Sequence, residues 1–270
     1  MAVQNTEWNS NCGWSTRDQV VTYGSDLVND LLGRIDFGGM FFLGISGREP
    51  TTAESRVFNA LMVTLVEHGQ TPSTIAARLT YLGAPEALQA AVSAGLAGLG
   101  TVFVGSIEGA AKLVQDLVGS QSQGVTDEAI REAVASIRTG GRAVPGIGHP
   151  VHKPVDPRAV RLFEIAKEES VYGPHCAAME RIAALASELY QRNLPVNATG
   201  AIGAIASELG LPWRVTRGLG VVARSAGIVA HLKEEMEHPF ARALWMRVDE
   251  EVGGAPADSA RGPAGTSRSS

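Results

Sequence analysis

The chain has 270 residues, of which 44% are hydrophobic and 19% are charged. It is long enough to bury the core of one large domain or two smaller ones, and its composition excludes a disordered chain. The net charge of −5 argues against a nucleic-acid-binding surface, which is usually basic. Two cysteines, Cys12 and Cys176, are too few for a disulfide framework, and no metal-ligand spacing occurs, so we expect no metal.

Helical periodicity and helix-capping residues dominate the chain, and no segment shows the apolar–polar alternation of surface strands. The polar residues 1–16 are expected to form an N-terminal arm without a signal peptide, and residues 253–270 a disordered tail. No apolar run approaches ~18 residues, so we expect no membrane span. With only two cysteines, a reduced cytoplasmic setting is expected. The sequence therefore predicts an all-α fold.

The predicted helices are marked by caps, prolines and glycines. A short helix over residues 23–32 would begin at the N-cap Ser25 and stop at Gly33, ahead of the apolar segment Phe37–Leu43. Thr51–Glu54 has the form of a capping box. Further helices are expected over residues 51–68, 73–82, 86–99, 108–118, 126–138, 156–167, 174–191, 199–209 and 213–236.

The segment Val144–Arg158 contains two candidate functional residues close together in the sequence. A Pro-Gly-Ile-Gly turn leads directly to His149, and Arg158 follows nine residues later. An imidazole can donate or accept a hydrogen bond near neutral pH, and an arginine fork can hold a carboxylate through two hydrogen bonds. The pattern favours a site for a carboxylic acid with a polarisable carbonyl or hydroxyl. The alternative is a plain connection between helices with a solvated histidine.

The longest predicted helix adds a second set of polar residues. Arg217, Arg224 and His231 are spaced by seven residues among apolar and small neighbours, so they share one face. A buried arginine needs a partner. Arg224 could face solvent or an internal glutamate, or it could face an anionic ligand or a subunit interface. Gly220 and Gly227 favour the second possibility because glycine permits close approach of a neighbouring backbone.

Taken in order, these motifs resemble the citrate synthase superfamily, and most of all its citryl-CoA lyase members, including the lyase module of ATP-citrate lyase. The resemblance runs from about Leu31 to Pro239. The segments that carry it are residues 47–51 (Gly-Arg-Glu-Pro-Thr), 67–69 with 73–78, 145–149 with 156–158, 197–203 and 223–231.

The resemblance implies a citrate synthase-like two-domain helical fold with the active site in the cleft between the domains. The large domain would comprise residues 17–103 and 210–252, and the small domain residues 104–209. It also implies a homodimer or higher homo-oligomer, with acyl-CoA and a keto acid as its small-molecule partners.

The resemblance also implies roles for single residues. His149 would handle the proton of a substrate hydroxyl or bind the keto oxygen, and Arg158 and Arg224 would hold substrate carboxylates. His68 could orient substrate, although a helix-capping role is an alternative, and His231 is a further substrate-binding candidate.

Coenzyme A, as part of an acyl-CoA substrate or product, is the cofactor that the resemblance implies. Its binding residues would be the loop residues Pro145, Gly146, Ile147 and Gly148. Its phosphates would need basic residues nearby, for which Lys153, Arg192 and Arg142 are candidates.

Two positions depart from the family pattern. Phe103 occupies the place where citrate synthases carry a histidine, and Thr199 occupies the place of the catalytic aspartate. A threonine hydroxyl is a poor general base near pH 7. Another group, such as Glu108 or a water held by Thr199, would then supply the proton.

The expected function is a citryl-CoA lyase-like enzyme that cleaves or forms the carbon–carbon bond between an acyl-CoA and a 2-keto acid. The alternatives are an acyl-CoA thioester hydrolase on the same scaffold and a catalytically weak CoA-ligand-binding paralogue. No phosphate-binding Gly-x-x-x-x-Gly-Lys-Ser/Thr motif occurs, so the substrate would have to be a preformed CoA thioester.

Overall fold

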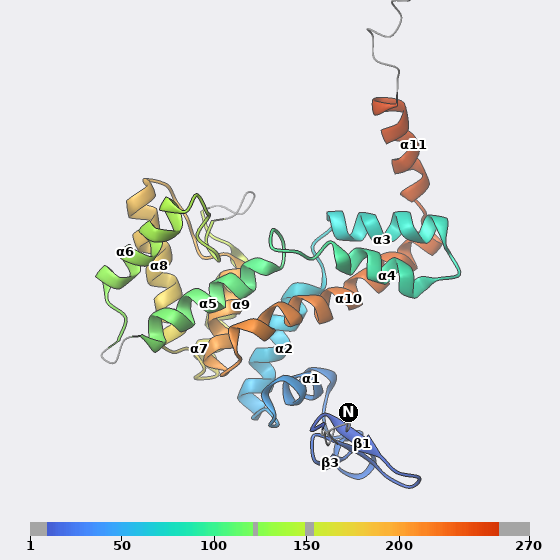
Figure 1. The fold of residues 1–270 in the computed structure, drawn as a ribbon, viewed down its shortest axis with the longest axis horizontal. Helices are drawn as coiled ribbons and strands as arrows, with labels where there is room; N and C mark the ends of the chain where they lie inside the picture. Colours follow the sequence, from blue (N-terminus) through green and yellow to red (C-terminus); the bar gives the residue numbers. More distant parts are fainter. Residues whose placement is uncertain (1–9, 121–123, 149–153, 254–270) are drawn as a thin grey trace, which may run out of the picture. The chain divides into compact units, whose positions relative to one another are not determined.

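The computed structural model describes residues 10–120, 124–148 and 154–253 (Figure 1). The chain divides into two compact units. Unit 1 comprises Met1–Glu67 and Leu99–Arg224, and unit 2 comprises His68–Gly98 and Ser225–Ser270. This division does not coincide with the predicted large and small domains, and that assignment stays a prediction. The predicted tail beyond Gly253 lies outside the described residues.

Unit 1 begins with a small antiparallel sheet of order β1–β2–β3, formed by Gly13–Ser15, Val20–Thr22 and Ser25–Asp26. Tyr23 and Gly24 both have positive φ values, 50° and 85°, which closes a tight two-residue hairpin turn between β2 and β3. A π-helical turn, η1 (Leu27–Leu31), follows with Asp26 as its N-cap. The predicted helix over residues 23–32 is therefore shortened to the turn Leu27–Leu31, because residues 22–25 form a hairpin. Of the predicted N-terminal arm, Gly13–Ser15 forms β1, and residues 1–9 lie outside the described residues.

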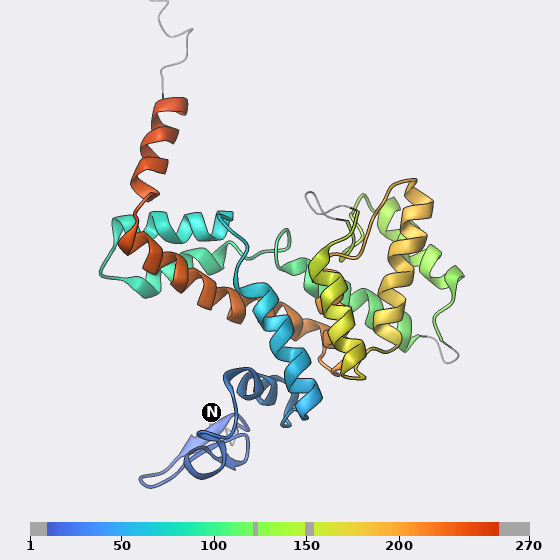
Figure 2. The same cartoon turned by 180° about the vertical axis from the view of Figure 1, so that it is seen from behind.

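The helices of unit 1 surround α9 (Ala198–Glu208), which packs against α5 (Gly105–Gly119), α7 (Pro157–Glu168) and α8 (Pro174–Tyr190) (Figures 1 and 2). The unit also contains α1 (Phe37–Ser46), α2 (Thr52–Val66), α6 (Asp127–Thr139) and the first half of α10 (Trp213–Glu237). Gly203 lets α5 and α9 approach closely, because a Cβ there would lie 2.8 Å from the Ile107 carbonyl oxygen. This helix core positions the loops at the N-terminus of α9.

Unit 2 is built from α3 (Pro72–Gly83), α4 (Leu88–Ala97), the second half of α10 and α11 (Ala241–Val252). Ala77, Ala91, Ile228 and Leu232 form its buried core. The helix α11 contacts α3 near its start, but Ala241 is its single buried residue. The sequence prediction missed α11 because it took Pro239 as the end of the helical chain.

The prediction of an all-α class is confirmed, with the small sheet as an addition. The apolar segment Phe37–Leu43 lies within α1, and the predicted capping box at Thr51 and Glu54 is present at the start of α2. Within the described residues, no helix combines the length and the apolar character needed to cross a membrane.

Candidate active site

The Gly-Arg-Glu-Pro-Thr motif forms a corner between α1 and α2. Gly47 ends α1 in the left-handed conformation, with a φ of 77°. Arg48 places its two terminal nitrogens 2.8 and 2.5 Å from the carboxylate oxygens of Glu54, which also accepts a hydrogen bond from the Thr51 amide. The Arg48 hydrogen bonds lower the pKa of Glu54 to about 2, against the effect of burial. The motif therefore fixes a helix connection.

The predicted CoA loop is held by backbone contacts to the segment before α9. The amide of Gly148 donates to the Pro195 carbonyl at 2.7 Å, and the amide of Asn197 donates to the Gly146 carbonyl at 3.0 Å. Gly146 has a φ of 85°, and a Cβ on Gly200 would lie 2.1 Å from its carbonyl oxygen. Only glycine fits this approach, so the loop has one defined place against the first turn of α9.

Asn197 joins the loop to the predicted catalytic residue Thr199. Its side-chain amide donates to the Gly148 carbonyl at 2.7 Å. Its Oδ1 accepts from the Gly200 amide at 3.0 Å, as the N-cap of α9, and from the Thr199 hydroxyl at 2.7 Å. Because the hydroxyl proton of Thr199 is used in this bond, its oxygen is left to act as an acceptor.

Asp156 joins the N-termini of α7 and α9. Its carboxylate is fully buried and accepts hydrogen bonds from the amides of Arg158 and Ala198, both at 3.0 Å. The Arg158 side chain forks onto the same carboxylate, through Nε at 3.0 Å and Nη2 at 2.8 Å. Burial by itself would raise the pKa of Asp156, but the bonds from Arg158 and Ala198 lower it to about 2.

These contacts change the interpretation of Arg158. The fork predicted to hold a substrate carboxylate holds Asp156, and the side chain is 29% exposed. A role of Arg158 toward substrate stays a prediction. His149 and Lys153, the central histidine and one of the basic candidates, lie outside the described residues.

The N-terminal turn of α5 lies next to the same loop. A Cβ on Gly109 would approach Pro145 to 3.0 Å, so α5 and the loop are in close contact. Glu108, the predicted alternative proton donor, forms an ion pair with Arg217 at 2.5 Å. Arg217 thus pairs with an internal glutamate. The basic candidates Arg142 and Arg192 are both exposed.

Arg224 is buried and caps the end of α2. Its Nε donates to the Leu65 carbonyl at 3.2 Å, where a helix C-terminus presents carbonyl oxygens. Burial lowers the pKa of Arg224, and the charge of Glu67 opposes that shift only in part. At the other position of departure, Phe103 is half-exposed in the turn before α5.

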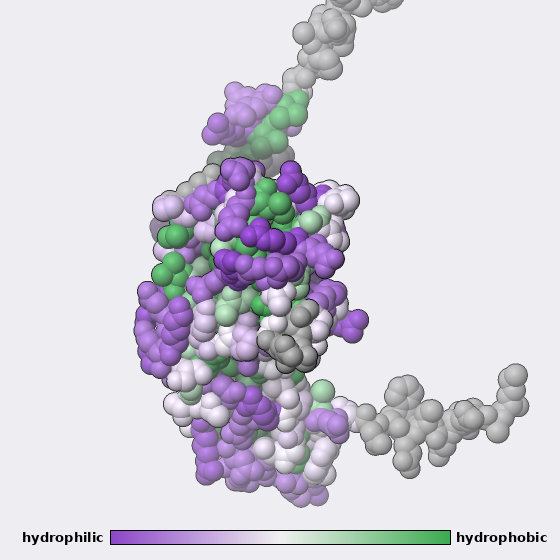
Figure 3. Space-filling view, turned by 90° about the vertical axis from the view of Figure 1, so that its left-hand side faces the viewer, coloured by the Kyte–Doolittle hydropathy of each residue, from purple (hydrophilic) through white to green (hydrophobic). Residues whose placement is uncertain are grey.

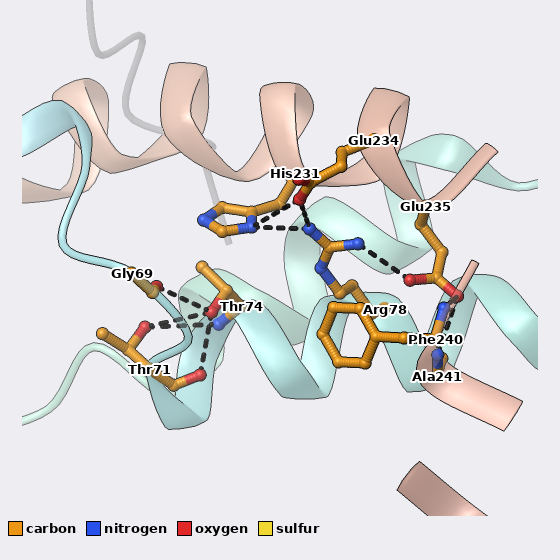
Figure 4. Close-up of polar contacts among 9 residues, drawn as sticks. All are labelled: Gly69, Thr71, Thr74, Arg78, His231, Glu234, Glu235, Phe240 and Ala241. Carbon is orange, nitrogen blue, oxygen red and sulfur yellow. Dashed lines mark hydrogen bonds and ion pairs between the residues drawn. The ribbon is translucent and has the colours of Figure 1, made fainter. Parts of the chain in front are cut away.

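His68 and His231 lie in unit 2, where the structure shows a polar cluster that the sequence analysis missed (Figure 4). Arg78 of α3 is fully buried and contacts His231 at 2.9 Å and Glu235 at 2.8 Å. The available signal was an arginine among the small residues of Ser73–Arg78, together with paired glutamates three residues beyond His231. Among the described residues, no group of histidine, cysteine and carboxylate side chains could hold a metal.

A model of the family "Citrate synthase, C-terminal domain" matches residues 22–245, which is most of the chain. The chain belongs to the citrate synthase family. It is 30% identical over 185 residues to the citrate synthase-like protein oryE of Aspergillus oryzae, covering 66% of this chain and 40% of that protein. It is also 30% identical over 210 residues to the peroxisomal citrate synthase 1 of Arabidopsis thaliana, covering 75% and 41%. The chain therefore spans less than half the length of these two curated relatives.

This family member is also similar to solved structures. Citryl-CoA lyase from Hydrogenobacter thermophilus aligns with a TM-score of 0.81 at 32% identity, covering 93% of this chain and 96% of that one. ATP citrate lyase from Methanothrix soehngenii, solved with citrate and coenzyme A, aligns with a TM-score of 0.70 at 20% identity. That alignment covers 98% of this chain and 43% of the larger enzyme. The citrate synthase-like helical fold predicted from the sequence is confirmed.

Proposed function

We propose that this protein is an enzyme of the citryl-CoA lyase type, which cleaves or forms the carbon–carbon bond between an acyl-CoA and a 2-keto acid. The observation that carries the proposal is the junction of the 144–148 loop, the Asp156–Arg158 pair and the Asn197–Thr199 turn. The similarity to citryl-CoA lyase over almost the full length of both chains supports the same assignment.

In the cleavage direction, a 3-hydroxy-3-carboxy-acyl-CoA loses its hydroxyl proton as the keto group forms. His149 is the residue proposed to take that proton. The bond between the hydroxyl-bearing carbon and the carbon next to the thioester then breaks, and its electron pair becomes the acyl-CoA enolate. Arg158 and Arg224 would hold the carboxylates and so select which bond breaks.

The enolate must then gain a proton at carbon. Thr199 has no basicity for this step, but its oxygen can accept a hydrogen bond from a water because its own proton is held by Asn197. The ion-paired Glu108 sits on the α5 turn that meets Pro145 and is the other candidate. We favour a water held by Thr199, since Glu108 is already paired with Arg217. The hydroxide left when this water protonates the enolate would take the proton that His149 removed from the substrate hydroxyl, which restores both the water and the neutral histidine.

Coenzyme A would lie along Pro145, Gly146, Ile147 and Gly148, a loop whose shape is fixed by its contacts to α9. The exposed Arg142 and Arg192 are proposed to meet its phosphates, because an arginine fork matches phosphate geometry. Lys153 is a further candidate on sequence grounds.

The test is incubation of the purified protein with (3S)-citryl-CoA and related 3-hydroxy acyl-CoA thioesters. Release of a keto acid together with acyl-CoA is the expected result. Release of free CoA without keto acid would instead indicate a thioester hydrolase, and binding without turnover a CoA-binding paralogue. His149→Ala should abolish most of the cleavage, and full retention would overturn the role given to that histidine.

We also propose that the protein forms a homodimer or a higher homo-oligomer. The helix α11 exposes Trp245, Val248 and Val252 along one side, at 56%, 51% and 77%. An isolated helix of this length is marginal in water unless its apolar side is covered. By contrast, the face nearest α6 and α8 is mostly hydrophilic, with small separate hydrophobic patches (Figure 3). We propose that a second copy of the chain packs against the exposed apolar side of α11.

This second proposal is tested by the mass of the protein in solution. The double variant Trp245→Glu, Val248→Glu should shift it toward the monomer in light scattering after size exclusion. Glu250→Lys, a change on the polar side of the same helix, is the matched control and should leave the mass unchanged. A wild-type monomer at micromolar concentration would contradict the proposal.

A further inference from the structure

Unit 1 contains a cavity of about 450 Å³ between η1, α1 and α2. Small-molecule sites usually have volumes of about 300–1,000 Å³. One wall comes from η1 and the start of α1, and the other from the corner before α2 and the first turns of α2, which packs against α1 (Figure 2). The cavity shares no residue with the 144–148 loop, the Asp156–Arg158 pair or the Asn197–Thr199 turn. The proposed reaction therefore does not use it.

The lining of this cavity combines an apolar surface with charged side chains. Leu31 is 2% exposed, and Ile35 and Pro50 are half-buried. Charged side chains from both walls line the same space: Asp30, Arg34, Asp36, Glu49 and Arg56. An apolar surface with a few charged groups around it is typical of a site for a small molecule that has both an apolar part and charged groups.

Three of the five charged side chains are already bound within the protein. Arg56 pairs with two glutamates of α7. Asp30 accepts a hydrogen bond from the amide of Asp26 at 3.0 Å. Asp36 is the N-cap of α1 and accepts from the amide of Gly39 at 2.6 Å. These contacts fix the walls of the cavity.

Arg34 and Glu49 differ from the other three. Within the part of the chain that the structure describes, neither side chain forms a hydrogen bond or an ion pair. Arg34 lies in the connection between η1 and α1, and Glu49 in the corner between α1 and α2. An arginine fork can hold a carboxylate, and a glutamate carboxylate can accept from an ammonium group. Opposite charges that stay apart in one cavity match a ligand that carries both groups.

We propose that this cavity binds a free α-amino acid with an apolar side chain. Arg34 holds its carboxylate, and Glu49 accepts from its ammonium group. Its side chain lies on the apolar surface of Leu31, Ile35 and Pro50. Three carboxylates and two arginines line the cavity, so a zwitterion fits the charge of the lining better than a phosphate or a dicarboxylate does. This site is additional to the proposed reaction and does not depend on it.

The test is isothermal titration calorimetry of the full-length protein with L-leucine, L-methionine and L-phenylalanine. We expect saturable binding of at least one, and no binding of any of them at about 10 mM would overturn the proposal. The amino acid that binds most tightly is then compared with its analogues that lack the ammonium or the carboxylate group, which for leucine are 4-methylpentanoate and 3-methylbutylamine. Each analogue should bind about 10-fold more weakly or worse, because it loses one charge-assisted contact. An analogue that binds as tightly as the amino acid would contradict a site for a zwitterion.

Two variants test whether the amino acid binds in this cavity. Arg34→Gln and Glu49→Gln should each weaken binding by about 10-fold, since each leaves one charged group of the ligand without its partner. Arg17→Gln and Glu86→Gln are matched controls outside the cavity and should keep the wild-type affinity. All four side chains are exposed, so the variants should fold. Unchanged affinity in both Arg34→Gln and Glu49→Gln would show that the amino acid binds elsewhere and would overturn the assignment.

Discussion

The loop site of unit 1 and the arginine cluster of unit 2 hold their polar groups in different ways. At the loop, main-chain hydrogen bonds and a contact between Gly146 and Gly200 fix the geometry, and side chains are added to it. In unit 2, one charged side chain, Arg78, organises a histidine and two glutamates. A site held by backbone contacts should lose little stability when one of its side chains is removed, whereas a cluster held by one charged side chain should lose much more when that side chain is removed.

The largest expected effect comes from removing that centre. Arg78→Met leaves Glu235 buried without its partner, and breaking a buried pair in this way costs about 3–5 kcal/mol. Urea unfolding of the variant measures the loss. Arg161→Met is the control, because Arg161 pairs with two glutamates on the surface and should contribute less than about 1 kcal/mol. Equal losses for the two variants would remove the distinction between a buried centre and a surface network.

The next effect sharpens the comparison, because unit 1 also contains buried charged groups, and Asp156 is the carboxylate among them. The folded pKa of Asp156, about 2, is depressed from its ordinary 3.8, so this carboxylate stabilises the fold above pH 4 and loses that contribution as the pH falls toward 2. The contribution is about 2–3 kcal/mol. Unfolding free energies measured from pH 5 downward should fall more steeply for wild type than for Asp156→Asn. The exposed Asp18→Asn variant should follow wild type, and parallel curves for wild type and Asp156→Asn would contradict the role.

The close contact between Gly200 and Gly146 tests whether the loop site depends on backbone packing. Gly200→Ala puts a Cβ 2.1 Å from the Gly146 carbonyl oxygen, so the loop or the helix must shift, at a cost of about 1–3 kcal/mol. Gly218→Ala is a matched helical control because a Cβ there meets no atom within 4 Å, and it should stabilise by about 0.5–1 kcal/mol. Thermal unfolding of both variants should move in opposite directions. A neutral Gly200→Ala would show that the close approach is dispensable.

The sequence predicted the features that depend on neighbouring residues. The capping box at Thr51 and Glu54 and most helix bounds follow from caps, prolines and periodicity. The 23–25 hairpin was missed because it depends on a positive φ at Tyr23, a residue type that does not indicate one. The cluster around Arg78 was missed because its partners are more than 150 positions away in the chain.

Only part of the candidate site was predicted, because the sequence shows local motifs but not contacts between distant residues. The Pro-Gly-Ile-Gly turn and Asp156-Pro-Arg158 are local motifs, so the sequence marked them as candidates. The pairing of Arg158 with Asp156 depends on the burial of the Asp156 carboxylate. In this buried position the carboxylate also accepts a hydrogen bond from the amide of Ala198, 42 positions away. The sequence analysis assigned the guanidinium of Arg158 to a substrate carboxylate, because the sequence does not show that the carboxylate of Asp156 binds it instead.

The smallest change in stability gives the sharpest test of the loop. Asn197→Ala removes the N-cap of α9 and the bond to the Gly148 carbonyl, whereas Thr126→Ala removes only the N-cap of α6. Each should cost about 1 kcal/mol, so stability alone does not separate them. Asn197→Ala should also lower kcat/KM for citryl-CoA by about 10- to 100-fold, because small displacements of a reacting group are costly. Faster hydrogen exchange at the Gly148 amide in Asn197→Ala alone would show that one side chain holds the loop, even if citryl-CoA is not the substrate. Unchanged exchange would show instead that the backbone contacts alone hold the loop in place. The loop would then differ most clearly from the cluster in unit 2, which depends on the single side chain of Arg78.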